Sequence, residues 1–268
     1  MQEVKPSSWW HWAIILLVLA YASVLLLVPL AVTLVQAFAN GLDPILATFQ
    51  DPNVQHALYL TLVVALIAVL VNAILGTITA WVLVRQKFFG QSWLNALVDV
   101  PFVFSPVIAG YVLISLFGRG GWFAPTPFPI VFAVPAIILA KIFVTLPFIA
   151  REVGLMLAHL DLQEEEAAIA LGASRWRTFW RVVFPGIRNG LMYGIMLTFA
   201  RALGEFGAVT VAGGSIQGKT ETATVVIFRL MQDRNTTGAY SLALLLGVIA
   251  ILLLFAMQWF RQRIEGER

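Results

Sequence analysis

The chain has 268 residues, of which 60% are hydrophobic and only 12% are charged. Soluble domains carry about 25% charged residues, so this chain has too few charges for a water-facing shell. The composition therefore excludes a water-soluble enzyme and a disordered chain, and it predicts an integral membrane protein. Cysteine is absent, which excludes disulfides and thiol chemistry.

Six long apolar segments predict six transmembrane helices, because about 20 apolar residues are needed to cross a bilayer. We expect the spans at residues 13–38, 57–84, 93–117, 130–149, 190–212 and 239–260. The third span contains two prolines, Pro101 and Pro106. The predicted fold class is all-α, with one membrane domain over residues 13–260, an internal loop at 151–189, and tails at 1–12 and 261–268.

The cationic side chains predict the orientation of these spans. With six spans both termini lie on one side, and 11 of the 17 Lys and Arg residues fall on that side. Four fall on the other side and two inside the membrane. Because cytoplasmic loops retain positive charge, we expect both tails and the 151–189 loop in the cytoplasm. The basic residues are not clustered on one face, so no nucleic-acid partner is expected.

The 151–189 loop is predicted to contain two short helices. Glutamates 164–166 suit the positive end of a helix dipole, and Gly172 is expected to end that first helix. Ser174 is expected to cap a second helix, which Pro185 would end. The second helix would carry an apolar face made of Trp176, Phe179, Trp180 and Val183. By composition alone this element fits either an interfacial helix under the lipid headgroups or a docking element for a partner protein.

Three features of this loop resemble the EAA loop of ABC-importer permeases. Glu166-Ala167-Ala168 is followed after three residues by Gly172, and after nine more by a segment that ends in Pro185. The family pattern ends in I-x-L-P, whereas this chain has Val182 and Phe184 in place of Ile and Leu. The resemblance implies a type I, MetI-like permease fold whose cytoplasmic loop is a coupling helix seated in a separate ATPase subunit. The coupling residues it implies are Glu165, Glu166, Ala167, Ala168, Gly172, Ala173 and Pro185.

A second motif is typical of nucleotide-binding proteins, but we reject a nucleotide site here. Residues 213–220 fit the phosphate-loop pattern G-x-x-x-x-G-K-[ST] in full. However, they lie in the expected extracellular loop, and only about 26 residues separate the flanking spans, too few for a nucleotide-binding sheet. We expect Gly213 and Gly214 to let the chain turn as it leaves the membrane.

Four charged residues fall inside the predicted spans, where charge is costly and therefore informative: Asp99 in the third span, Lys141 in the fourth, and Arg201 and Glu205 in the fifth. Arg201 and Glu205 are four residues apart and can pair along one helix face, and Lys141 lies about 15 Å deep from Arg151 at 1.5 Å per residue. These residues are either a structural ion pair with a buried lysine, or part of a translocation path that tolerates an anion. Gly186, Gly190 and Gly194 form a ladder of small residues that suits helix packing.

The segment Ala200–Val209 resembles the fifth-span signature of permeases for tetrahedral oxyanions. Together with Gly218-Lys219-Thr220 and residues 148–152, it is most similar to sulfate/thiosulfate importer permeases, and to the W-type of their two permease subunits. The resemblance implies a path or gate whose expected residues are Lys141, Arg201, Glu205, Phe206 and Gly207.

The function implied is that of a non-catalytic permease subunit in the bacterial inner membrane, which translocates sulfate or thiosulfate. Its implied partners are a second related permease in a heterodimer, two ABC ATPase subunits, a periplasmic sulfate-binding protein and the lipid bilayer. No cofactor and no metal are expected.

Two alternatives stay open: a molybdate/tungstate permease, typically a homodimer, and an ion-driven secondary anion carrier. The carrier would need mid-membrane coupling carboxylates, for which Glu205 is the clear candidate, and no inverted repeat is evident. An intramembrane enzyme is disfavoured because H-E-x-x-H is absent and membrane acids are too few for an aspartyl dyad.

Overall fold

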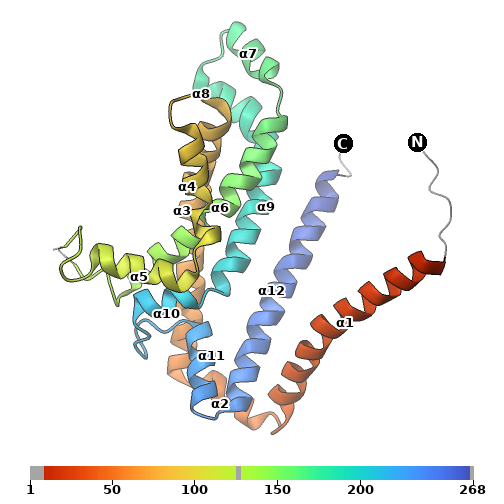
Figure 1. The fold of residues 1–268 in the computed structure, drawn as a ribbon, viewed down its shortest axis with the longest axis vertical. Coiled ribbons are helices and arrows are strands. Elements are labelled where there is room, and N and C mark those ends of the chain that lie inside the picture. The colour runs from red at the N-terminus through yellow and green to blue at the C-terminus, as the bar shows by residue number, and fades with distance from the viewer. Residues whose placement is uncertain (1–8, 125–127, 266–268) are drawn as a thin grey trace.

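The computed structural model describes residues 9–124 and 128–265, and every regular element in that part of the chain is a helix. Parts of both expected tails, residues 1–8 and 266–268, lie outside the described residues. Long helices run between two ends of the molecule, with α7 and α8 at one end and α2 and α11 at the other (Figure 1). The helices are α1 (Trp9–Phe38), α2 (Asp43–Gln50), α3 (Pro52–Arg85), α4 (Gln91–Val103), α5 (Pro106–Phe117), α6 (Val134–His159), α7 (Leu162–Ala170), α8 (Arg175–Thr178), the π-helix η1 (Phe179–Val183), α9 (Phe184–Leu203), α10 (Gly207–Gly213), α11 (Ala223–Gln232) and α12 (Thr236–Glu265).

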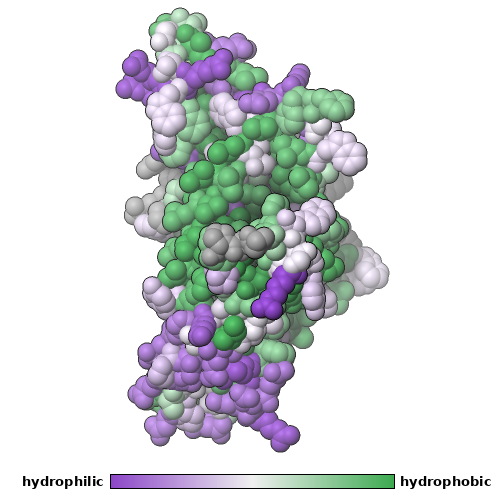
Figure 2. Space-filling model, turned by 90° about the vertical axis from the view of Figure 1, so that its left-hand side faces the viewer, coloured by the Kyte–Doolittle hydropathy of each residue, from purple (hydrophilic) through white to green (hydrophobic). Residues whose placement is uncertain are grey.

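The lengths and compositions of these helices suit a bilayer. Among the described residues, five helical stretches are long and apolar enough to cross it, and a sixth crossing results if the bent pair α4–α5 is counted as one span. Figure 2 shows a continuous hydrophobic band between two hydrophilic ends. Since backbone groups find no water inside a membrane, an all-helical chain satisfies them within each segment.

The third expected span is not one straight helix. Residues 93–117 divide into α4 and α5, whose axes differ by 113°. The break falls at Ser105, which has φ −58° and ψ 137° and directly precedes Pro106. Proline disfavours the α conformation in the residue before it, so the chain extends there and a new helix starts at Pro106. Pro101, by contrast, lies inside α4 without ending it.

The fourth span runs further than expected. Helix α6 begins at Val134 rather than 130 and continues to His159, ten residues beyond the expected boundary at 149. Arg151, whose charge suggested the start of the loop, instead forms two contacts of 2.9 and 2.6 Å with the carboxylate of Asp99 on α4. The α6 helix thus continues for eight residues beyond Arg151, and the Arg151 guanidinium is paired with a carboxylate of the neighbouring helix α4.

The fifth span differs at both ends from the expected 190–212. Helix α9 ends at Leu203, with Gly204 as its C-cap, and a separate short helix, α10, follows from Gly207. At the other end the expected stop at Pro185 is wrong, because α8, η1 and α9 form one apolar helical stretch from Arg175 to Leu203. The Phe184 N–H bonds to the Phe179 carbonyl, five residues back, and this wider π turn accommodates a proline without an N–H.

Helix α3 lies at the centre of the packing, against α6 along its length and also against α9. The glycine ladder of α9 faces α6: a Cβ on Gly194 would lie 3.0 Å from the Ile149 Cα, and one on Gly190 would lie 2.7 Å from the Glu152 carbonyl oxygen. The expected helix-packing role of these glycines is therefore confirmed. Helix α1 is different, since its apolar side chains are mostly exposed and it packs on α12.

We expect Gly190→Ala to destabilise the protein by about 1–3 kcal/mol, because the added methyl group has no room against α6. Gly247→Ala is the matched control, since a Cβ there meets nothing within 4 Å and the gain in helix propensity of up to about 1 kcal/mol is the same. Thermal unfolding of both variants in detergent measures the difference. Equal melting temperatures for the two variants would contradict the close α9–α6 contact.

Candidate functional site

The loop with the EAA resemblance folds as a capped helix that projects from the membrane body (Figure 1). The Asp161 side chain accepts a hydrogen bond from the Gln163 N–H at 2.9 Å and caps the start of α7. At the other end Gly172 has φ +85°, with bonds from Gly172 N–H to Ile169 O and from Ala173 N–H to Ala168 O. This bond pair is a Schellman motif, which needs a left-handed residue at the glycine position. Gly172 therefore sets the sharp turn that presents α7, as expected.

The glutamates of α7 face in different directions. Glu165 is half-buried, and its Oε1 lies 2.7 Å from a guanidinium nitrogen of Arg85 at the end of α3. Glu166 and Ala167 are exposed, and Ala168 is half-buried. The Glu165 carboxylate therefore faces the body of the protein, whereas Glu166 and Ala167 are accessible to a partner.

The predicted apolar face of the second helix is split. Ser174 caps α8 as expected, accepting a bond from the Arg177 N–H at 3.3 Å. Phe179 and Val183 pack inward against α3 and α6, whereas Trp176 stays 70% exposed and Trp180 45% exposed. The rings of Trp176, Phe179 and Trp180 pack on one another, with centroids 5.3 to 6.3 Å apart, so they form one aromatic cluster whose Phe179 side is covered and whose Trp176 side is exposed.

Exposed apolar side chains surround the turn at this end of the molecule. Leu171 is 89% exposed, and Ile169 and Trp176 are also largely exposed. An interfacial helix would bury such residues in lipid, but α7 projects beyond the ends of the long helices (Figure 1). An exposed apolar cluster next to an accessible carboxylate suits a protein partner.

A second polar region lies within the membrane body. The Arg201 Nη1 is 2.6 Å from the Glu205 Oε2, so the expected i, i+4 pair is formed. Glu205 is 1% exposed, whereas the Arg201 side chain is 34% exposed. The pair therefore has a buried anionic half and an accessible cationic half, which suits attraction of an anion.

Glu205 also fixes the joint between α9 and α10. Its Oε1 accepts the Ala208 N–H at 3.0 Å in the first turn of α10, and its carbonyl oxygen accepts the Thr224 hydroxyl at 2.8 Å. Gly207 lies against α5, where a Cβ would be 3.1 Å from Val107 Cγ2. The structure thus brings Arg201, Glu205 and Gly207 together where α5, α9 and α10 meet. The Phe206 ring contacts that of Phe228 on α11, with centroids 5.3 Å apart and the planes inclined by 55°.

Lys141 is fully buried in α6, and its ammonium nitrogen has no hydrogen-bond partner among the described residues. A buried cation without a partner is costly, and within membrane proteins such groups mark functional positions. Lys141 on α6 is therefore a candidate position in addition to the Arg201–Glu205 ion pair.

Sequence reasoning missed the uncharged polar residues of this region. Asn72 on α3 is fully buried and donates to Thr145 Oγ1 at 2.8 Å and to the Ile142 carbonyl at 3.0 Å on α6. Thr198 on α9 is also fully buried, and its hydroxyl has no partner among the described residues. The sequence feature that could have identified Asn72 is that it is the one amide side chain in the uncharged 57–84 segment.

The phosphate-loop match folds as a turn. The N–H groups of Lys219, Thr220 and Glu221 all bond to one oxygen, the Ile216 carbonyl, at 3.0, 2.9 and 3.2 Å. Within the motif the N–H groups of Lys219 and Thr220 are therefore already bonded, as is that of Ile216 to the Thr220 hydroxyl, and no strand precedes the loop within the described chain. Gly214 has φ +73° at the C-cap of α10 and supplies the expected turn.

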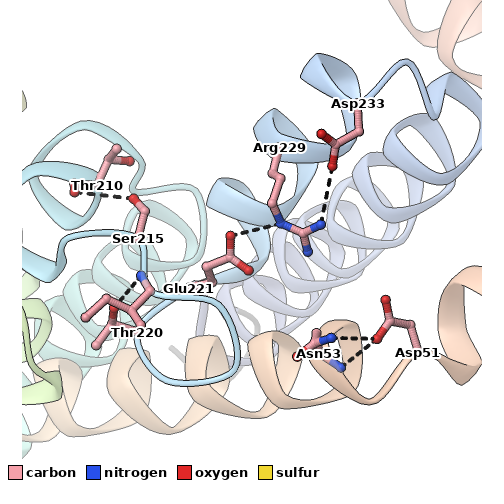
Figure 3. A network of polar contacts seen from close by, with 9 residues as sticks. Asp51, Asn53, Thr210, Ser215, Thr220, Glu221, Arg229 and Asp233 are labelled. Carbon is pink, nitrogen blue, oxygen red and sulfur yellow. Dashed lines mark hydrogen bonds and ion pairs between the residues drawn. The ribbon is translucent and has the colours of Figure 1, made fainter.

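A polar network follows this turn at the α2–α11 end (Figure 3). Arg229 on α11 lies 3.0 Å from Glu221 and 3.5 Å from Asp233. Glu221 is 3% exposed, so this pair connects a buried carboxylate just before α11 to the side chain of Arg229 within the same helix. Sequence patterns predict no role for these charges beyond the side of the membrane on which they lie. No cluster of three or more metal-ligating side chains occurs within the residues that the structure describes.

Residues 72–266 match the family model of the "Binding-protein-dependent transport system inner membrane component". The chain is 43% identical to the "Sulfate transport system permease protein CysW" of Escherichia coli (strain K12), over 99% of this chain and 92% of that protein. It is 36% identical to the "Sulfate transport system permease protein CysT" of Synechocystis sp., over 97% of this chain and 95% of that protein.

Two solved structures have a similar fold. A bacterial ABC transporter involved in the import of the acidic polysaccharide alginate aligns with a TM-score of 0.80 at 18% identity, over 96% of both chains. The MetNI methionine ABC transporter in an inward-facing conformation aligns with a TM-score of 0.56 at 17% identity, over 79% of this chain and 94% of that one. The expected all-α, MetI-like importer fold is therefore confirmed.

We expect Lys141→Met to raise the stability of the protein by at least about 1 kcal/mol, because it removes a buried charge without a hydrogen-bond partner and keeps a chain of similar length. Lys219→Met removes an exposed lysine and should change stability by less than about 0.5 kcal/mol. Thermal unfolding in detergent measures both. A lower melting temperature for Lys141→Met than for the control would mean that the ammonium group stabilises the packed helices.

Proposed function

The chain belongs to the family of binding-protein-dependent transport system inner membrane components, and from that premise we propose that it is the sulfate-translocating permease subunit of an ATP-driven importer. The observation that carries the proposal is the 43% identity to the sulfate permease CysW over 99% of this chain. The protein itself carries out no bond chemistry, because ATP hydrolysis resides in a separate subunit of such importers.

The proposed orientation places α7, α8 and both termini in the cytoplasm. The excess of Lys and Arg on that side supports this topology. The α2–α11 end then faces the periplasm, where a sulfate-binding protein would deliver its ligand. Exposed Glu166 and Ala167, the Gly172 turn and Trp176 support docking of α7 into an ATPase subunit.

The proposed assembly contains two permease chains and two ATPases. Similarity to both CysW and CysT, at 43% and 36% identity, supports pairing of this W-type chain with a T-type partner. Each ATPase would hold one α7, and closure of the ATPases on ATP would favour the outward-facing pore. The free energy that favours one pore state over the other is the difference, between the two states, in the free energy with which α7 docks on the ATPase.

The proposed path passes the joint of α5, α9 and α10. Arg201 offers an accessible guanidinium, Lys141 adds a second cation, and the buried Glu205 carboxylate keeps their net charge at +1. Weak net attraction suits a transporter, because the anion must enter and also leave. Phe206 and Gly207 would form the moving edge, since they connect α9 to α10 next to α5.

Reconstitution tests this function directly. The complex of this chain with the second permease, ATPase and binding protein is placed in proteoliposomes with the binding protein outside and ATP inside. We expect ATP-dependent uptake of radiolabelled sulfate that unlabelled molybdate does not compete away. Uptake without the ATPase, or uptake of molybdate in preference to sulfate, would contradict the proposal.

We expect Glu166→Lys to abolish transport and to release the ATPase from the membrane complex, because it reverses the charge of the accessible α7 carboxylate. Co-purification of the ATPase with the tagged permease measures the association. Asp43→Lys is the matched control, an exposed charge reversal on α2 at the opposite end. Unchanged ATPase recovery with Glu166→Lys would reject the docking role.

We expect Arg201→Ala to lower sulfate uptake by about tenfold or more, whereas Arg201→Lys retains part of it because the positive charge remains. Uptake rates at several sulfate concentrations, together with thermal unfolding, separate transport from stability. If Arg201→Ala lowers the melting temperature but leaves uptake unchanged, the Arg201–Glu205 pair is structural only.

A further inference from the structure

Helix α7 is attached to the membrane body by few side chains. None of its residues is buried, and its neighbours are the short α8 and η1 segments. The Glu165 side chain makes a direct polar bond from α7 to a membrane-spanning helix, at Arg85 of α3. A force applied to α7 therefore reaches the membrane core through the chain itself and through this ion pair.

Arg85 joins three elements at one point. It is the last residue of α3, and its Nη2 donates to Glu165 Oε1 at 2.7 Å and to the Leu160 carbonyl at 3.2 Å. Leu160 is the C-cap of α6. The side chains of Arg85 and Glu165 are only 9% and 13% exposed, whereas those of the Arg151–Asp99 pair are 37% and 42% exposed. Because it is shielded from solvent, the Arg85 pair is less screened by water and salt than an exposed pair.

The opposite end of α3 makes a second specific bond. The Thr61 hydroxyl is buried and accepts the Ala223 N–H at 2.8 Å, at the first residue of α11. The hydroxyl also donates to the Ala57 carbonyl at 2.6 Å, so it acts as both a hydrogen-bond donor and an acceptor. Thr61 and Arg85 are 24 residues apart, or about 36 Å at 1.5 Å per residue, which spans the hydrophobic core.

Between these ends α3 is a single helix without a break, and it lies against both α6 and α9. The bonds from Asn72 to α6 lie about midway along it. By contrast, α4–α5 and α9–α10 are interrupted within the membrane region. Among the described helices that contact the α7 end, α3 thus offers an unbroken connection to α11.

We propose that α3 transmits the movement of α7 across the membrane to α11, and that Arg85 and Thr61 are the positioning residues at its two ends. This rests on the proposed function, in which an ATPase moves α7. Arg85 passes the movement to α3, and Thr61 passes it to the start of α11. Helix α11 in turn is linked to the joint at Glu205, whose carbonyl accepts the Thr224 hydroxyl.

Charge exchange tests the α7 end in the reconstituted complex, with ATP hydrolysis and radiolabelled sulfate uptake measured in the same vesicles. We expect Arg85→Glu to lower the sulfate transported per ATP by at least about fivefold, the lower range for coupling between sites, while hydrolysis continues. The double exchange Arg85→Glu with Glu165→Arg should recover most of the ratio. Lys87→Glu, an exposed charge reversal two residues away, should leave it unchanged.

A threonine pair tests the other end. Thr61→Val keeps the shape but removes the acceptor for the Ala223 N–H, so the transport-to-hydrolysis ratio should fall. Thr77→Val is the control on the same helix, because Thr77 bonds to the Ala73 carbonyl of its own helix. Since both changes interrupt one connection, Thr61→Val added to Arg85→Glu should cost less than the product of the single effects.

The outcomes separate this inference from the function on which it rests. If the unaltered complex shows no ATP-dependent sulfate uptake, the proposed function fails and the inference fails with it. If the unaltered complex transports, an unchanged ratio in Arg85→Glu overturns the inference alone. The inference is also overturned if Arg85→Glu lowers the sulfate transported per ATP and the double exchange does not restore it. In that case the Arg85–Glu165 ion pair does not connect α7 to α3.

Discussion

A bilayer offers no water to a polar group in its core, and this constraint decides where the chain can bend and where it can keep charge. At the two backbone interruptions within the membrane region, the groups freed by the break are either bonded or missing. At the α9–α10 break the carbonyl of Glu205 accepts a hydroxyl from Thr224, and its carboxylate accepts an N–H of α10. The break before α5 begins at Pro106, which has no N–H to satisfy. In the proposed function these bends lie next to the path of the anion.

The same constraint gives the remaining polar side chains two distinct roles. Asn72, Thr61 and Arg85 bond across helices and hold α3 to its neighbours. Lys141 and Arg201 are left partly or wholly without such bonds. In our proposals the first group makes α3 a connection across the membrane, and the second lines the path of the anion. A permease needs both, because the motor that drives it lies outside the membrane.

Hydropathy and charge predicted the existence of the spans but not their shape. An average over 20 residues does not register the Ser105–Pro106 break, and Arg151 suggested a boundary because its partner, Asp99, lies 52 positions away. The i, i+4 spacing predicted the Arg201–Glu205 pair, although the helix ends between the two residues. The turn at Gly172 and the cap at Ser174 were predictable because both are local. Cross-helix bonds, such as Arg85–Glu165, need the tertiary structure.

The proposed transport requires above all that α7 lies in the cytoplasm and is held by the ATPase. Because the chain has no cysteine, single substitutions at exposed positions can be labelled without altering other sites. In right-side-out spheroplasts, Leu171→Cys should react with a membrane-permeant maleimide but not with an impermeant one, and assembly with the ATPase should protect it. Lys219→Cys, at the other end, should react with both reagents. Labelling of Leu171→Cys by the impermeant reagent would contradict the account.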